Sequence, residues 1–278
     1  MKKYTLIGHP LGHSMSPFIH SELFKLSGIE AEYDCTDIAA EDFLKKAEGL
    51  RSLDGYNVTI PYKLDIIPCL DVLDESAKRY KSVNCVHNNN EKAIGYNTDC
   101  DGFLMSVKAK SLALSERVLI IGCGGVGRMM AIEAALHGAD LTLGIIPEAA
   151  SAAAELCEEI KFLSADSKVR VKPVDTISGT YDLIINASPV GMYPKIDACP
   201  VSTELIGLCG GVFDAVYNPV KTRLIQTAEA FGKPAVNGTA MLVYQAVRAH
   251  EIWNGSSYTN EQVQDIIDKT NAIIAGEF

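Results

Sequence analysis

An apolar segment that runs into a glycine-rich turn and then into a helix is the strongest constraint in this sequence. Residues 118–127 read VLIIGCGGVG, which places Gly122, Gly124 and Gly127 in a G-x-G-x-x-G spacing. In such a turn one glycine makes the tight bend, one lets the backbone approach a pyrophosphate, and one lets helix and strand pack closely. A purely structural glycine turn is the alternative. The strand before the turn and the helix after it favour a doubly wound α/β domain that binds a dinucleotide.

The alternation of strands and helices extends over most of the chain. Strand-like segments in the first hundred residues are 4–8, 31–38 and 53–60, and helical ones are 16–28 and 41–50. We expect an N-terminal α/β domain with a largely parallel sheet. Two short strands, at 84–88 and 92–97, flank a hairpin turn at 89–91. A second series begins near residue 117, with strands at 117–121, 139–146, 169–175, 181–188 and 211–217.

Several residues mark the expected ends of helices. Ser16 and Pro17 suit the N-cap and first position of one helix, and Gly28 suits its end. Near the C-terminus, Asn260 suits the cap of a helix with one apolar face, formed by Val263, Ile266, Ile267, Ile273 and Ile274. No strand follows residues 240–253 or this last helix, so we expect both helices to pack back onto the N-terminal domain.

The length of the chain indicates two domains rather than one. We place an α/β domain at residues 1–104 and 239–278, and a dinucleotide-binding domain at 105–238.

Charge and cysteine usage limit the partners. The net charge of −10 argues against nucleic acid or an anionic membrane as the partner, because both need a cationic face. The apolar run near the N-terminus is too short for a signal peptide, and no stretch reaches the ~18 apolar residues of a membrane span. The eight cysteines show no C-x-x-C spacing, so we expect reduced core thiols, no metal site and a cytoplasmic protein.

The segment NVTIPYK, residues 57–63, carries the first chemical signal. Its alternation predicts a half-buried strand that ends at Pro61 and presents Lys63 just beyond. Asp99 follows another strand end, in GYNTDCDG. Alone, Lys63 would be interpreted as a surface cation and Asp99 as a helix cap. Ligands bind at the carboxyl ends of the strands in open α/β sheets, and a lysine oriented there by an aspartate can give a proton to a reduced carbonyl oxygen or remove it.

The segment GHPLGHSMSP contains two hydroxyls at a turn from strand to helix. Ser14 and Ser16, with the amides of a helix N-terminus, would suit a carboxylate, although Ser16 alone would equally suit a cap. We interpret His13 and His20 as packing or capping residues rather than ligands.

The strand at 139–146 does not decide whether the nicotinamide cofactor is NAD or NADP. An acidic residue at its end would bind the ribose of NAD, and an arginine the 2′-phosphate of NADP, but Ile145 and Ile146 stand there. Glu148 suits the first turn of the next helix. Arg128 or Lys168 would reach a phosphate only if the fold brings them to it.

Eight stretches together resemble the shikimate dehydrogenase family. In order they read GHPLGHSMSPFIH, NVTIPYK, SVNCV, GYNTDCDGF, IIGCGGVGR, INASPVGM, FDAVYNP and NGTAMLVYQA with IWNG after it. The resemblance implies the reversible NADPH-dependent reduction of 3-dehydroshikimate to shikimate in aromatic amino acid biosynthesis. It also implies an N-terminal substrate domain, a Rossmann domain, C-terminal helices that return to the first domain, and a monomer or homodimer.

The resemblance assigns roles to individual positions. Lys63 and Asp99 match the family's catalytic pair. The positions that match substrate contacts are Ser14, Ser16, Asn57, Thr59, Asn84, Tyr217 and Gln245. The positions that match cofactor contacts are Gly122, Cys123, Gly124, Gly125, Val126, Gly127, Ile145, Glu75, Ala215, Gly238 and Met241.

One departure from the family pattern leaves two other functions as alternatives. Where NADP-using members place an arginine, this chain has Ile145, Ile146 and Pro147, and the aspartate of NAD-preferring relatives is missing too. An NAD-preferring quinate/shikimate dehydrogenase is therefore the close alternative. A non-catalytic Rossmann protein that senses a ligand is a more distant one, because a sensor would need neither Lys63 nor Asp99.

Overall fold

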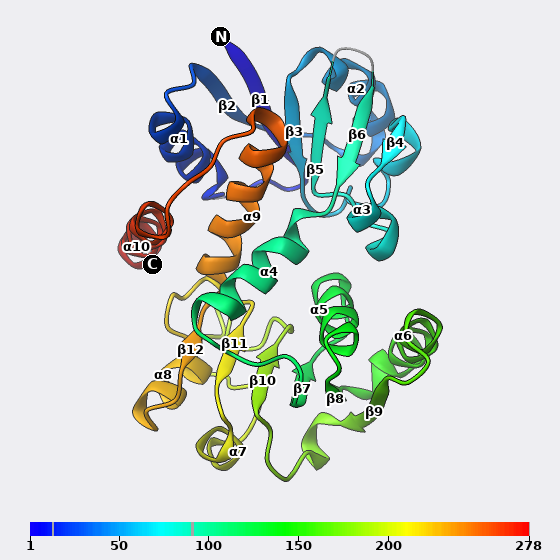
Figure 1. Ribbon diagram of the computed structural model, residues 1–278, viewed down its shortest axis with the longest axis vertical. Helices are drawn as coiled ribbons and strands as arrows, with labels where there is room; N and C mark the ends of the chain where they lie inside the picture. Colours follow the sequence, from blue (N-terminus) through cyan, green and yellow to red (C-terminus); the bar gives the residue numbers. More distant parts are fainter. Residues whose placement is uncertain (13, 90–91, 278) are drawn as a thin grey trace. The chain divides into compact units, whose positions relative to one another are not determined.

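The computed structural model describes residues 1–12, 14–89 and 92–277. The chain forms two compact units, drawn in Figure 1. The first contains Met1–Gly102 and Leu242–Thr270, and the second contains Phe103–Met241 and Asn271–Phe278. Within the described ranges, no helix is long and apolar enough to cross a membrane.

The first unit contains a six-stranded sheet in the order β2-β1-β3-β5-β6-β4. Its strands are β1 (Lys2–Gly8), β2 (Ala31–Asp37), β3 (Gly55–Val58), β4 (Val72–Leu73), β5 (Cys85–Asn88) and β6 (Ala93–Tyr96). The predicted hairpin of β5 and β6 is present, although part of its turn lies outside the described residues. The sheet is largely parallel, as predicted, because β1 pairs in parallel with β2 and β3, and β4 with β6. It is nevertheless mixed, since β5 runs antiparallel to both of its neighbours.

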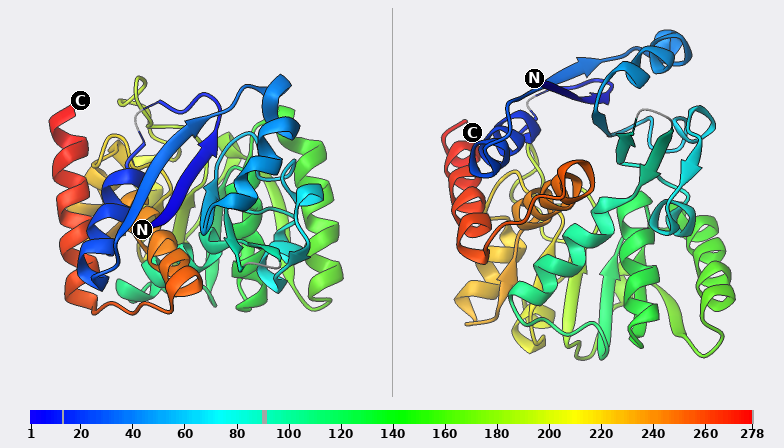
Figure 2. Two further views of the ribbon diagram at one scale, coloured as in Figure 1. Left: turned by 90° about the horizontal axis from the view of Figure 1, so that it is seen from above. Right: turned by 45° about the horizontal axis from the view of Figure 1, so that its top comes forward.

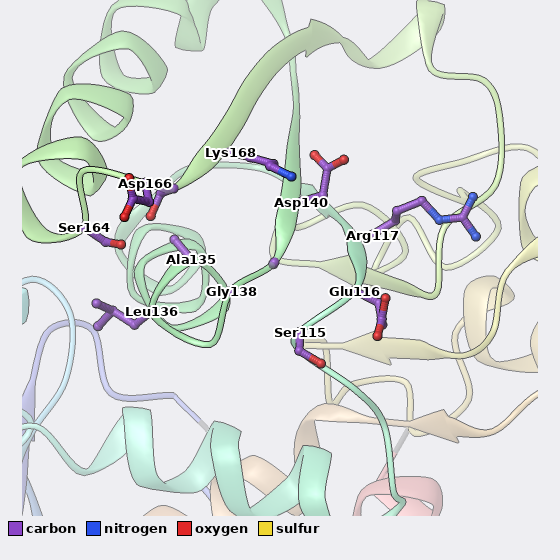
Figure 3. A pocket seen from close by; sticks show the side chains of 12 residues that line it. Ser115, Glu116, Arg117, Ala135, Leu136, Gly138, Asp140, Ser164, Asp166 and Lys168 are labelled. Atoms are coloured by element: carbon purple, nitrogen blue, oxygen red, sulfur yellow. The ribbon is translucent and has the colours of Figure 1, made fainter.

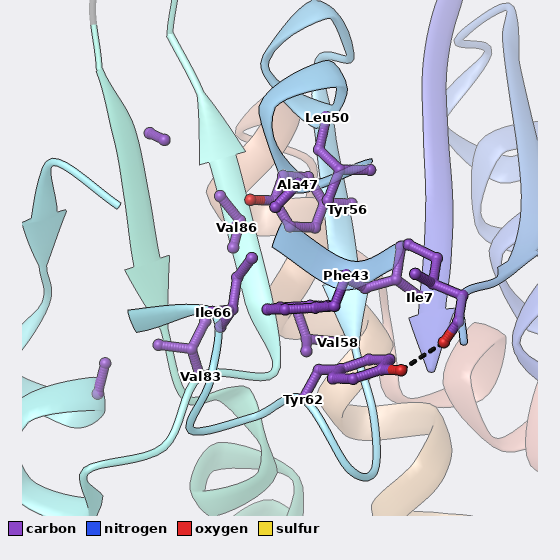
Figure 4. Packing of buried hydrophobic residues seen from close by; sticks show 13 residues of the cluster. Ile7, Phe43, Ala47, Leu50, Tyr56, Val58, Tyr62, Ile66, Val83 and Val86 are labelled. Carbon is purple, nitrogen blue, oxygen red and sulfur yellow. Dashed lines mark hydrogen bonds between the residues drawn. The ribbon is translucent and has the colours of Figure 1, made fainter. Parts of the chain in front are cut away.

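Helices cover both faces of this sheet. On one face, Phe24 of α1 (Ser16–Ser27) and Trp253 of α9 (Gly238–Asn254) pack against Tyr4 of β1, and Figure 2 shows both helices from two sides. On the other face, Phe43 of α2 (Phe43–Gly49) packs with Tyr56 of β3, as Figure 4 shows. All four residues of β3 are buried, so the prediction of a half-buried strand was wrong. The strand lies between β1 and β5, and both of its faces are covered.

The C-terminal helices pack on the first unit, as predicted. The indole of Trp253 donates a hydrogen bond to the backbone oxygen of Val86 (2.9 Å). Lys269 of α10 (Asn260–Glu277) pairs with Glu22 of α1 at 3.1 Å. The cap of α10 lies one residue earlier than predicted. Thr259 and Gln262 exchange hydrogen bonds between side chain and backbone, which is the reciprocal geometry of a capping box, and Asn260 is already helical.

The second unit contains a parallel six-stranded sheet in the order β12-β11-β10-β7-β8-β9. Its strands are β7 (Arg117–Ile121), β8 (Asp140–Ile145), β9 (Lys168–Pro173), β10 (Leu183–Asn186), β11 (Val212–Asp214) and β12 (Ala235–Val236). This is the strand order of a Rossmann fold, with the change of direction between β7 and β10. The remaining helices are α3 (Glu75–Tyr80), α4 (Thr98–Ala109), α5 (Gly125–Leu136), α6 (Ala150–Leu163), α7 (Thr203–Leu208) and α8 (Arg223–Ala230).

All eight cysteines lie in described segments, and none is in a disulfide. Cys85, Cys100 and Cys209 are buried, whereas Cys35 and Cys199 are exposed. The expectation of core thiols therefore holds for only part of the set.

A buried carboxylate connects the end of β10 with the segment between β11 and α8, at the carboxyl edge of the second sheet. Asp214, at the end of β11, accepts hydrogen bonds from Asn186 Nδ2 (2.9 Å) and from the Thr222 hydroxyl (2.6 Å). It also accepts one from the backbone N–H of Val216 (3.0 Å). Burial raises the pKa of Asp214 from 3.8 to about 6, even though these hydrogen bonds favour the charged form.

The raised pKa of Asp214 predicts how stability depends on pH. A carboxyl whose pKa is higher in the folded protein stabilises it below the unfolded pKa, and that contribution is lost as the pH rises through about 6. Between about pH 4.5 and about pH 8, the wild type should lose about 2 kcal/mol more unfolding free energy than Asp214→Asn. Urea unfolding of both proteins at the two pH values measures this difference. An equal loss in both proteins would contradict the prediction.

Candidate active site

The carboxyl edge of the first sheet brings most of the predicted polar residues together. Parallel strands β1, β3 and β6 all end there, and the antiparallel β5 begins there. The strand ends, loops and helix N-termini at this edge carry Ser14, Ser16, Asn57, Thr59, Lys63, Asn84 and Asp99. Gln245 of α9 joins them through contacts with the Asn84 and Thr98 side chains.

Lys63 is held by the turn that follows β3. The buried ring of Tyr62 stacks on Phe43, with 4.2 Å between ring centroids, and its hydroxyl donates a hydrogen bond to the backbone oxygen of Ile38. The backbone oxygen of Lys63 accepts a hydrogen bond from the N–H of Val83 (2.8 Å). An apolar anchor and a backbone hydrogen bond therefore fix the position from which the lysine side chain extends.

Lys63 and Asp99 form an ion pair. Lys63 Nζ lies 2.6 Å from Asp99 Oδ2, and the two side chains are only 24% and 17% exposed. The other carboxylate oxygen, Asp99 Oδ1, accepts a hydrogen bond from Asn84 Nδ2 (2.9 Å). Both carboxylate oxygens of Asp99 therefore have a hydrogen-bond partner. The carboxylate orients the lysine at a site that is partly shielded from solvent.

The orientation of the Asn84 amide follows from its neighbours. Asn84 Oδ1 accepts a hydrogen bond from the backbone N–H of Thr98 (2.7 Å), which can only donate. The NH₂ group must therefore face Asp99 and the Thr98 hydroxyl, which lies 3.0 Å away. Asn84 is 3% exposed, so this network is fixed by the fold rather than by solvent.

Ser14 and Ser16 occupy the turn between β1 and α1. The backbone N–H of Ser16 donates a hydrogen bond to the Ser14 hydroxyl oxygen (3.2 Å). The predicted N-cap at Ser16 was therefore wrong: the helix begins at Ser16, Met15 is in the cap position, and Ser14 binds the first helical N–H. Pro17 and Gly28 lie at the two ends of the helix, as predicted.

Of the two histidines interpreted as packing residues, His20 is fully buried and stacks on Tyr33, with 4.1 Å between ring centroids. His13 lies outside the described residues. In the described ranges, no three His, Cys, Asp or Glu side chains are grouped so that they could hold a metal ion.

The glycine-rich turn of the second unit has the geometry that phosphate binding requires. Gly122 has φ of 95°, which favours glycine, and a Cβ on Gly127 would lie 2.4 Å from the Gly122 oxygen. No atom lies within 4 Å of a Cβ built on Gly124, the N-cap of α5. The helix's first hydrogen bond runs from Arg128 N to Gly124 O (2.7 Å), so the N–H groups of residues 125–127 precede it at the helix N-terminus. These groups fit a dinucleotide pyrophosphate.

The other residues assigned to the cofactor are divided between the two units. In the second unit, a Cβ on Gly238 would lie 2.3 Å from the Ala215 oxygen, so these two residues are adjacent. Met241 is buried three residues further along α9, and Ile145 ends β8. Glu75 belongs to the first unit and pairs with Lys78 at 2.6 Å. Tyr217, assigned to the substrate, follows β11 in the second unit and is 39% exposed.

Neither of the two candidate cations for a 2′-phosphate stands at the end of β8. Arg128 Nε donates a hydrogen bond to Glu159 of α6 (2.8 Å), which neutralises it locally. Lys168 begins β9 and lies at the opposite edge of the sheet from the glycine turn. There it lines a pocket of about 360 Å³ with Glu116 and Asp140, as Figure 3 shows.

Sequence reasoning from the chain alone did not identify Tyr33. Its hydroxyl donates a hydrogen bond to Asn57 Oδ1 (2.8 Å), directly behind the site. Tyr33 lies on the edge strand β2, in the pattern AEYDCTD, where a tyrosine is ordinary. Only the register of β2 against β1 shows that it reaches the site.

Comparison with known proteins gives consistent results. Residues 6–86 match the family model described as the shikimate dehydrogenase substrate binding domain. The shikimate dehydrogenase (NADP(+)) of Shouchella clausii (strain KSM-K16) is 34% identical over 274 residues, which cover 96% of this chain and 98% of that protein.

Solved structures agree over the same length. A shikimate dehydrogenase crystallised with NADP+ is 33% identical, has a TM-score of 0.87, and aligns over 96% of this chain and 95% of its own. The enzyme of Listeria monocytogenes in complex with shikimate and NAD is 26% identical, has a TM-score of 0.85, and aligns over 96% of each chain. The chain belongs to the shikimate dehydrogenase family.

Proposed function

We propose that this protein catalyses the reversible NADP-dependent reduction of 3-dehydroshikimate to shikimate, with Lys63 and Asp99 as its catalytic pair. The observation that carries the proposal is the 2.6 Å contact between Lys63 Nζ and Asp99 Oδ2 at the carboxyl edge of the first sheet. Membership of the family and the names of the relatives, among them an NADP-dependent shikimate dehydrogenase, support the substrate and the cofactor.

The position of Lys63 beside Asp99 suits it to transfer a proton. A bound nicotinamide cofactor supplies or accepts the hydride. When the carbonyl is reduced, Lys63 donates a proton to the oxygen that becomes the hydroxyl, and in the reverse direction the neutral amine removes it. Asp99 keeps Nζ in place through their hydrogen bond, while Asn84 keeps Asp99 in place.

The remaining site residues have binding roles in this proposal. Ser14 and Ser16 hold the substrate carboxylate, with the N-terminal end of α1 beneath them. The side chains that contact the ring hydroxyls and the carboxylate include Asn57, Thr59, Asn84, Tyr217 and Gln245. The cofactor contacts are Gly122–Gly127, Ile145, Ala215, Gly238, Met241 and Glu75. Residues 1–104 with 239–278 form the substrate domain, and 105–238 the dinucleotide domain.

Discrimination between NADP and NAD is weak in this proposal. The residue after β8 is Ile146, which is 56% exposed, and Arg128 is bound to Glu159. A charge-assisted hydrogen bond to a phosphate contributes about 1.5–3 kcal/mol, so its absence removes roughly ten- to hundredfold of NADP preference. The same observation favours the second candidate, an NAD-preferring quinate/shikimate dehydrogenase. Initial rates with shikimate and quinate, each with NADP and NAD, distinguish the two.

Replacement of Lys63 tests the catalytic assignment. Lys63→Ala should lower kcat for shikimate oxidation by about 10²–10⁴-fold, because general acid–base catalysis contributes that much, with a change of only a few fold in the KM for shikimate. Lys46→Ala is the matched control, since Lys46 is an exposed lysine that pairs with Asp42 on the same unit. Steady-state kinetics of both variants decide the matter. An unchanged kcat in Lys63→Ala would remove the lysine from the mechanism.

A cation introduced after β8 tests the cofactor assignment. Ile146→Arg should raise kcat/KM for NADP by about tenfold or more and leave kcat/KM for NAD within about twofold, because only NADP carries the 2′-phosphate. Ile146→Gln controls for loss of the exposed isoleucine. If arginine improves both cofactors equally, or neither, the residue after β8 does not face the ribose.

A further inference from the structure

A line of buried and partly buried side chains runs from Asn57 to the segment between α9 and α10. In that segment, the hydroxyl oxygen of Tyr258 lies 2.9 Å from Nδ1 of His250, which belongs to α9. His250 Nε2 lies 3.0 Å from His20 Nδ1 in α1. The ring of His20 stacks on Tyr33 at 8° between planes, and the Tyr33 hydroxyl reaches Asn57. Both histidines are fully buried.

The direction of each hydrogen bond can be deduced from one end. The Tyr258 hydroxyl donates its single hydrogen to the backbone oxygen of Leu23 (3.1 Å), so it accepts from His250 Nδ1. His250 Nε2 is then an acceptor, and His20 Nδ1 donates to it. Within the described ranges His20 Nε2 has no hydrogen-bond partner, which suits a lone pair. Burial lowers the pKa of His250 to about 3 and that of His20 well below 6.5, so both rings are neutral.

Tyr33 connects this rigid pair to Asn57. Its ring rests flat on His20, and its hydroxyl donates to Asn57 Oδ1 at 2.8 Å. Asn57 Nδ2 donates to the backbone oxygen of Asn84 (3.1 Å), and a reversed amide would place two carbonyl oxygens face to face. Asn57 therefore keeps one N–H on Nδ2 to donate, and its carbonyl oxygen already has a partner.

We propose that Tyr33, supported by His20, is a positioning residue that presents Asn57 to the substrate as a hydrogen-bond donor. The inference rests on the proposed function, in which Asn57 contacts a substrate oxygen. It adds a specificity: the group that Asn57 binds must accept a hydrogen bond, as a hydroxyl or carboxylate oxygen does. His250 and Tyr258 fix the ring of His20 and hence the plane on which Tyr33 lies.

Removal of one hydroxyl separates this role from simple packing. Tyr33→Phe keeps the ring that stacks on His20 and leaves the Asn57 carbonyl without its donor. The KM for shikimate should rise about three- to tenfold, as expected for one lost hydrogen bond at a buried group. The kcat value and the KM for NADP should stay within about twofold, because Lys63 and the glycine turn are untouched. A packing role would lower the thermal midpoint and leave the KM for shikimate unchanged.

Tyr56→Phe is the matched control. Tyr56 precedes Asn57 on β3, is buried where Tyr33 is partly buried, and faces α2 on the other side of the sheet. It should leave the KM for shikimate unchanged. A similar rise in both variants would mean that any lost buried hydroxyl disturbs the site, and the inference would fail.

A double-mutant cycle completes the test. If Tyr33 acts through Asn57, Tyr33→Phe should raise the KM for shikimate in the wild-type background and have no further effect in Asn57→Ala. Equal effects in the two backgrounds would contradict the inference. The two proposals fail differently: a wild-type protein that does not oxidise shikimate overturns the proposed function, whereas an active wild type with a normal KM in Tyr33→Phe overturns only the role of Tyr33.

Discussion

The contacts of Asn84 hold the candidate site together. Its side chain accepts the backbone N–H of Thr98 and donates to Asp99, and its backbone oxygen accepts from both Val58 N and Asn57 Nδ2. One residue thereby fixes the end of β3, the start of β5 and the start of α4. Because Asn84 is buried, the loss of any of these hydrogen bonds would destabilise the site. The same hydrogen bonds position the Lys63–Asp99 pair.

Behind this first layer, the burial of aromatic and polar groups supplies rigidity. Tyr62 anchors the turn that carries Lys63, and Tyr33 with His20 supports Asn57. A site that must place a proton donor near a carbonyl oxygen benefits from such support, since a small displacement of the donor lowers the rate of proton transfer. In the second unit, Asp214 similarly holds backbone segments in position, because it accepts hydrogen bonds from the end of β10 and from the loop after β11.

The local patterns of the sequence predicted most of the fold. The glycine turn, the two strand–helix series and the C-terminal apolar face depend on neighbouring residues, and all are present. The alternation in NVTI was misleading, because a polar residue such as Asn57 that faces a buried site has the same pattern as one that faces water. Tyr33 was missed because it lies on β2 and contacts Asn57 on β3, and no local sequence pattern reveals a contact between strands.

In the proposed reaction the Lys63–Asp99 pair moves the proton, and the kcat of Asp99→Asn is the decisive measurement of that role. Asparagine preserves the size of the side chain and can still accept from Asn84, but it removes the charge that orients the lysine. We expect kcat for shikimate oxidation to fall by about a hundredfold or more, while the KM for shikimate changes only a few fold. A kcat equal to that of the wild type would contradict it.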